Sequence, residues 1–168
     1  MRLWLLKSDG SERLYAPLNL ERATHEWWSA NGDILYYCKY VKRTDGLSGN
    51  NAITGINLKT GEHKVYAPVP AWHGFSSLND EFYVYDENKQ FYRGTASSVG
   101  FYNAMTGKQV YIVTQNPPLA TSDEPSFYHL DPHPQFVLND RYVSYTIAVA
   151  GQPEVALAPT EQLLKLTQ

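Results

Sequence analysis

Two hairpin patterns that alternate along the chain constrain its fold more than any other feature of the sequence. The first pattern is a strand-like run, an Asn-Gly or Asn-Asp pair that begins at Asn31, Asn79 or Asn139, and a second run rich in Tyr, Val and Ile. Both residue pairs tolerate positive φ and suit tight turns, while the aromatic and β-branched runs suit strands. Each copy is therefore predicted to be a β-hairpin.

A second hairpin pattern lies between the copies of the first and turns at a glycine. It occupies residues 3–17, 55–68 and 100–113. Together the two patterns give units of four short strands, which are typical of β-propeller blades, whereas a β-sandwich would not require two hairpin types to alternate. The sequence therefore predicts an all-β fold, a β-propeller of about three four-stranded blades.

The expected domain is a partial β-propeller that covers the whole chain. It divides into a half-blade at 1–20, full blades at 21–70 and 71–118, and a final blade at 125–168. Residues 159–168 are expected to form a short helix. Because propellers close with about four to eight blades, we expect closure to require another chain or a missing N-terminal half of a longer protein.

Composition narrows the classes of partner. The formal net charge of −3 and the scattered Lys and Arg residues give no broad basic surface, so no nucleic-acid partner is expected. The start of the chain has no basic region followed by a long apolar run, and no apolar stretch is long enough to cross a membrane. The single cysteine, Cys38, excludes an internal disulfide and is expected to be an inert core thiol.

Three of the five histidines occupy one position of the repeat. His25, His73 and His133 each precede the turn asparagine of the first hairpin pattern by six residues. In a propeller the first strand of each blade lines the central channel, so these imidazoles are expected to converge near the axis. The alternative is that each histidine fills a structural position in a hydrogen-bonded network of its own blade.

Convergent imidazoles together with oxygen ligands would suit a divalent metal ion such as Mn, Fe, Ni or Zn. His129 and Asp131 precede His133 at alternate positions, and strand alternation would place all three side chains on one face. The sequence therefore predicts a metal site formed by these three residues and His73. The alternative for Asp131 is a polar strand entry that makes a turn before Pro132.

Three short motifs carry a resemblance to a known family: His-Glu-Trp-Trp-Ser from His25, His-Gly-Phe-Ser-Ser from His73, and Asp-Pro-His-Pro from Asp131. They resemble the later blades of the oligogalacturonate lyase family, and the resemblance covers essentially the whole chain. It implies a seven-bladed propeller that binds Mn²⁺ through three histidines and a glutamine. It further implies pectin degradation, a part of carbohydrate metabolism, in which β-elimination cleaves short uronate oligosaccharides to 4,5-unsaturated products.

The resemblance also implies roles for individual residues. His25 corresponds to the catalytic base and Arg2 to an arginine that assists at the substrate, while His73 and His133 correspond to metal ligands. The chain departs from the family where Asp131 replaces the third ligand histidine and where Tyr128 stands near the glutamine position. Asp131 and His129 are the expected replacements in a remodelled site. Trp72 and Tyr128 lie beside these positions in the sequence and are expected to contact the sugar rings of the substrate.

Two functions other than an active lyase are compatible with parts of the sequence. A non-catalytic, TolB-like propeller that binds a protein partner shares the same repeat, but it has no need of imidazoles at one position in three consecutive blades. An inactive, truncated lyase is the other alternative. No Gly-x-Ser-x-Gly motif is present, which disfavours a serine hydrolase. The lack of a signal sequence favours a cytoplasmic location, where imported oligomers would be broken down.

Overall fold

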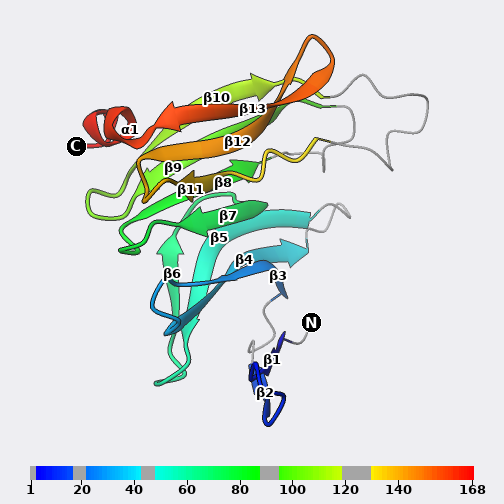
Figure 1. The fold of residues 1–168 in the computed structure, drawn as a ribbon, viewed down its shortest axis with the longest axis vertical. Helices are drawn as coiled ribbons and strands as arrows, with labels where there is room; N and C mark the ends of the chain where they lie inside the picture. The colour runs from blue at the N-terminus through cyan, green and yellow to red at the C-terminus, as the bar shows by residue number, and fades with distance from the viewer. Residues whose placement is uncertain (1–2, 17–21, 43–47, 88–94, 119–129) are drawn as a thin grey trace.

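The computed structural model describes residues 3–16, 22–42, 48–87, 95–118 and 130–168 (Figure 1). Arg2, Tyr128 and His129 lie outside these residues. Within them the chain forms antiparallel strands followed by a C-terminal helix, α1 (Thr160–Leu166). No helix of the described residues has the length and apolar character needed to span a bilayer.

The strands form a two-stranded sheet and three larger sheets, in which sequence neighbours pair with one another. The two-stranded sheet contains β1 (Leu3–Leu6) and β2 (Arg13–Ala16). The first larger sheet contains β3 (Arg22–Trp28), β4 (Ile34–Lys42), β5 (Ser48–Asn57) and β6 (His63–Ala67). The second contains β7 (His73–Ser76), β8 (Phe82–Glu87), β9 (Ser97–Asn103) and β10 (Lys108–Asn116). The third contains β11 (Gln135–Val137), β12 (Tyr142–Val149) and β13 (Gln152–Pro159).

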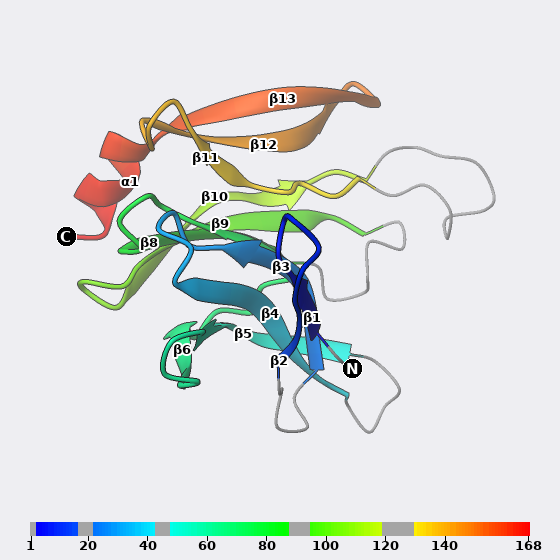
Figure 2. The same ribbon diagram turned by 60° about the horizontal axis from the view of Figure 1, so that its bottom comes forward.

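The larger sheets stand face to face in chain order, as blades do in a propeller (Figure 2). Their first strands are sheet edges, and both β3 and β11 contact β7. The apolar core lies between the sheets. One cluster, which includes Trp27 and Tyr83, joins the first and second larger sheets, and another, which includes Phe101 and Phe136, joins the second and third. The inner edges of three successive sheets are thereby brought together.

Adjacent side chains of β3 face the core and the solvent in turn, and Trp27 faces the core. Its ring stacks on Tyr36 with centroids 5.3 Å apart, and its Nε1 donates to Ser76 Oγ at 3.2 Å. Strand alternation turns the adjacent Trp28 outward, where it is 49% exposed. Only Trp27 of the two adjacent tryptophans therefore faces the core.

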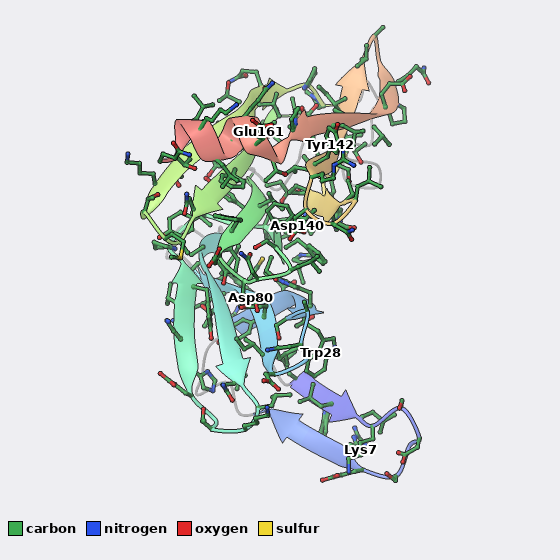
Figure 3. All side chains as sticks on the ribbon, turned by 60° about the vertical axis from the view of Figure 1, so that its left-hand side comes forward. Lys7, Trp28, Asp80, Asp140, Tyr142 and Glu161 are labelled. Carbon is green, nitrogen blue, oxygen red and sulfur yellow. The ribbon has the colours of Figure 1, made fainter. Side chains whose placement is uncertain are left out.

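In the first and second larger sheets, the turn after the first strand gives its asparagine a structural role. Asn31 Oδ1 accepts a hydrogen bond from Ser29 Oγ at 2.8 Å, and Asn79 Oδ1 accepts one from Ser77 Oγ at 2.7 Å. The third copy has Val137 in place of the serine, and its turn instead has positive φ at Leu138, Asn139 and Asp140. Asp140 Oδ2 accepts from the backbone N–H of Leu78 at 2.7 Å, so this turn contacts the turn of the second larger sheet (Figure 3).

The third larger sheet has three strands, and the chain forms α1 after β13, which confirms the short helix expected at residues 159–168. Leu163 is buried in the cluster between the second and third sheets. Asn103 Nδ2 donates to the backbone carbonyl of Thr167 at 3.2 Å, and Thr106 Oγ1 donates to the same carbonyl at 2.7 Å. These contacts fasten the helix to the second sheet and draw the chain away from the β13 edge.

Candidate functional site

His73 is held at the start of β7 by the strand next to it. The residue is 4% exposed and pairs in register with Asp86 of β8. Its Nδ1 lies 3.0 Å from Asp86 Oδ1 and 2.9 Å from Oδ2, and its backbone N–H donates to Oδ1 at 2.9 Å. Because a carboxylate only accepts hydrogen bonds, this contact places the ring proton on Nδ1 and the lone pair on Nε2.

Asp131 and His133 approach His73 from the segment that precedes β11. His73 Nε2 lies 3.9 Å from Asp131 Oδ2, and His133 Nε2 lies 3.8 Å from the same oxygen. The rings of His73 and His133 stack with centroids 3.6 Å apart. One ligand atom from each of the three residues lies within 4.8 Å of the other two, so the cluster can hold a metal ion.

The reason given from the sequence for this grouping was wrong. Residues 130–134 do not form a strand, so strand alternation does not align Asp131 with His133. The segment instead lies alongside β12, where Thr146 donates its backbone N–H to the Pro132 carbonyl at 2.8 Å. His133 then adopts a left-handed φ of 43°. A turn therefore brings the two side chains together.

His25 reaches the same place by a β-bulge. In the pairing of β3 with β4, Thr24 lies opposite Cys38 and Trp27 opposite Tyr36, so β3 contains one extra residue. Within the bulge His25 has a φ of 55°. Its ring centroid lies 4.1 Å from that of His73, 6.4 Å from that of His133 and 5.6 Å from that of Trp72. The three histidines that share one sequence position thus lie together in space.

Burial and neighbouring imidazoles lower the pKa of His25 and of His133. Burial, followed by the proximity of His73 and His133, lowers the pKa of His25 to about 4. Burial, followed by the proximity of His73, also lowers the pKa of His133. His25 is therefore a neutral imidazole near pH 7, able to accept a proton. Its basicity is weaker than that of an exposed histidine, which the sequence alone did not reveal.

The donor set fits a divalent transition ion. Neutral imidazole nitrogens with a carboxylate oxygen are ligands that Mn, Fe, Ni and Zn accept. The side chain of His73 is 5% exposed, that of Asp131 24% and that of His133 53%, so the cluster is anchored in the core and open to solvent on one side. That opening would admit both an ion and a further ligand.

The structure brings His25, His73, Asp131, His133 and Trp72 together, while Arg2, Tyr128 and His129 lie outside the described residues. Cys38 is fully buried, and burial raises the pKa of its thiol well above the usual value, in keeping with the expected inert core residue.

Sequence reasoning missed Asp86. It lies seven residues after Asn79, and the equivalent residues of the other two copies are Cys38 and Thr146. Because the carboxylate occurs in only one of the three repeats, it is not part of the pattern that the repeats share. The available signal was an acidic residue within an otherwise apolar and aromatic strand, since such a residue is buried only with partners.

Comparison with known proteins places this geometry in context. No protein-family model matches the chain. The oligogalacturonate lyase of Dickeya dadantii (strain 3937) is 26% identical over 172 residues, which cover 94% of this chain and 42% of that protein. The solved structure of an oligogalacturonate lyase in complex with manganese matches with a TM-score of 0.69 and 25% identity, over 93% of this chain and 40% of that one. The chain is related to the oligogalacturonate lyases.

The resemblance to this lyase family and the β-propeller fold expected from the sequence are both confirmed. TolB from Acinetobacter baumannii matches with a TM-score of 0.67 at 12% identity, over 96% of this chain and 36% of that one, a likeness of fold alone. The chain spans about two fifths of the length of the lyases that it matches.

Proposed function

We propose that this chain carries the metal centre and the base of a lyase that cleaves short uronate oligosaccharides by β-elimination. Galacturonate oligomers derived from pectin are the proposed substrate. The observation that carries the proposal is the cluster of His73, Asp131 and His133 beside the neutral imidazole of His25. The relation to lyases, one of them solved with manganese, supports the same reading.

Elimination from a uronate requires removal of the weakly acidic proton at C5. A divalent ion, for which we propose Mn²⁺, would act as a Lewis acid and neutralise the carboxylate next to that carbon. His73 Nε2, His133 Nε2 and the Asp131 carboxylate would hold the ion. The open side of the cluster, next to the exposed His133, is where the uronate carboxylate would enter.

His25 is the proposed general base. Its neutral ring would take the C5 proton, and the C–H electron pair would form the C4–C5 double bond. The C4–O bond would break with its electron pair on oxygen, and that oxygen would take a proton from water as the sugar leaves. The negative charge that develops on the substrate as the proton leaves would stabilise the imidazolium that forms and so offset the low pKa of His25 in the free protein. Trp72 lies beside His25 and would contact the sugar ring. By resemblance alone, Arg2 would pair with the developing negative charge.

Mn²⁺ binding and product formation are measured separately to test this proposal. With Mn²⁺ and di- or trigalacturonate, absorbance of the unsaturated uronate should rise. His25→Ala should abolish that rise and still bind Mn²⁺, because His25 is not among the proposed ligands. His73→Ala and His133→Ala should each lose metal.

His63→Ala is the matched control, since His63 begins β6 and is not part of the cluster. It should retain both metal and activity. Stoichiometric Mn²⁺ without any product would overturn the lyase proposal for this chain. Unchanged metal content in both ligand variants would overturn the metal site.

A non-catalytic propeller resembling TolB is the second candidate, and the fold-level likeness to TolB favours it. It predicts a protein partner and no unsaturated product. The same absorbance measurement distinguishes the lyase from the non-catalytic propeller. A non-catalytic propeller would give no rise in absorbance, so His25→Ala would not change the absorbance. An inactive relative of the lyases would bind Mn²⁺ yet give no product.

A further inference from the structure

Asp86 is the buried charge at the centre of the site, and the proposed chemistry gives it no role. It lies in β8 with 0% exposure, and its carboxylate accepts hydrogen bonds from β7 and from the segment that precedes β11. Oδ1 accepts from the backbone N–H and from Nδ1 of His73, at 2.9 and 3.0 Å. Oδ2 lies 2.9 Å from the same Nδ1 and accepts from the backbone N–H of His133 at 2.9 Å.

These contacts fix the tautomer of His73. A proton held on Nδ1 by the carboxylate leaves Nε2 unprotonated, and Nε2 is the atom that faces Asp131 and His133. A ligand histidine whose second nitrogen donates to a carboxylate is oriented by it and becomes a more basic ligand. Without the acceptor, either ring nitrogen could carry the proton.

The same carboxylate also fixes the distance between the two histidines. His73 belongs to the second larger sheet, whereas His133 precedes the first strand of the third. Asp86 joins their backbones directly, at a point where His133 has a left-handed φ of 43°. An otherwise unfavourable turn is thus held in place by a charge-assisted hydrogen bond.

We infer that Asp86 is a positioning residue that sets the ligand tautomer of His73 and the spacing of His73 and His133 before any metal binds. The inference rests on the proposed function for the identity of the site, but the arrangement that it describes involves only residues of this chain.

Asp86→Asn changes the chemistry with almost no change in volume. The amide has one accepting oxygen and one donating nitrogen, so it cannot accept from both backbone N–H groups in the present geometry. Its NH₂ group can also donate to Nδ1 of His73, which moves the ring proton to Nε2 and blocks the ligand position. The matched control is Glu87→Gln in the same strand, whose carboxylate accepts from the Tyr111 hydroxyl at 3.0 Å away from the cluster.

The first measurement is the tautomer of His73 in the metal-free full chain, read from the ¹⁵N shifts and long-range couplings of its imidazole. The wild type should show the proton on Nδ1, and Glu87→Gln should give the same spectrum. Asp86→Asn should show a mixed or reversed tautomer. A wild-type proton on Nε2 would overturn the inference without any variant, so a poorly folding variant does not prevent the test.

The second measurement is Mn²⁺ affinity by calorimetry or electron paramagnetic resonance, with circular dichroism to compare folding. Asp86→Asn should bind roughly 10- to 100-fold more weakly than the wild type, and Glu87→Gln should bind equally well. Equal affinity of Asp86→Asn and wild type would overturn the positioning role. A wild type that binds no Mn²⁺ would contradict the proposed function instead, and the tautomer would still decide whether Asp86 orients the ring.

Discussion

His25 and His133 have left-handed backbone conformations, with φ of 55° and 43°. Residues with a Cβ rarely adopt this region, and each such residue costs of order 1 kcal/mol or more unless its surroundings hold it there. At His25 the cause is the bulge in β3, and at His133 it is the turn before β11. The two side chains therefore reach the site through strained backbone conformations.

The strain at His25 predicts an unusual order of stability. His25→Gly should be more stable than His25→Ala by about 1 kcal/mol, because both changes remove the ring but only glycine adopts a φ of 55° without steric cost. Urea unfolding monitored by tryptophan fluorescence measures the difference.

The neighbouring Thr24 provides the control, since it pairs regularly with Cys38 in β4. There the order should reverse, with Thr24→Gly less stable than Thr24→Ala by about 0.5–1 kcal/mol. If alanine were the more stable replacement at both positions, the left-handed conformation of His25 would impose no strain.

Spacing alone was sufficient to find the three histidines, because a residue at one position of a repeat occupies one place in the fold. Other features of the site depend on contacts between distant residues. Asp86 accepts hydrogen bonds from His73 in β7 and from His133 in the segment before β11, and the segment at Asp131 is shaped by its contact with β12. Neither contact leaves a periodic signal in the sequence.

At the scale of single elements, a glycine in β9 shows how closely the strands pack. Gly100 lies opposite Tyr85 of β8, and the Tyr85 ring covers it. A Cβ at residue 100 would lie 2.3 Å from Cζ and 2.5 Å from the hydroxyl oxygen of Tyr85, which is itself fully buried. The hydroxyl donates to Gln109 of β10 at 3.2 Å, so the ring is fixed at both ends.

Gly100→Ala should therefore destabilise the protein by about 1–3 kcal/mol, the usual cost of overpacking a core. Ser98→Ala in the same strand is the control, because it loses only the exposed hydrogen bond to the Thr114 carbonyl and should cost about 1 kcal/mol or less. Thermal unfolding of both variants measures the difference. An unchanged midpoint for Gly100→Ala would mean that the Tyr85 ring can move aside.

The elements themselves differ in how well the sequence predicts them. Regular hairpins were expected from the turn residues at Asn31 and Asn79 and from the aromatic runs that follow, and the structure contains them. The third sheet was less predictable. Its turn lacks the serine that supports the asparagine, whereas α1 was expected from the sequence and buries Leu163 against the second sheet.

At the scale of the whole molecule, apolar side chains are exposed on two outward-facing strand surfaces. Leu3 and Leu5 of β1 pack toward the first larger sheet, which leaves Trp4 and Leu6 on the opposite face, 51% and 68% exposed. On β13, Ala158 packs toward the second sheet, and the outward-facing Val155 and Leu157 are 75% and 55% exposed. A propeller blade normally buries both of its faces against neighbouring blades.

These surfaces predict that the chain self-associates in solution. Replacement of both Val155 and Leu157 by lysine should weaken self-association at least about tenfold, because burial of two such side chains supplies a few kcal/mol and two added charges oppose contact. Sedimentation velocity over a range of protein concentrations measures the change.

The matched control replaces Met105 and Leu58 by lysine. Both are exposed, at 68% and 39%, and both lie between paired strands in the glycine turns, so the added charge is the same but β13 is untouched. This control should associate like the wild type. Equal weakening by both double variants would mean that net charge governs association, and a wild type that stays monomeric at every concentration would mean that the outward face of β13 is stable in water.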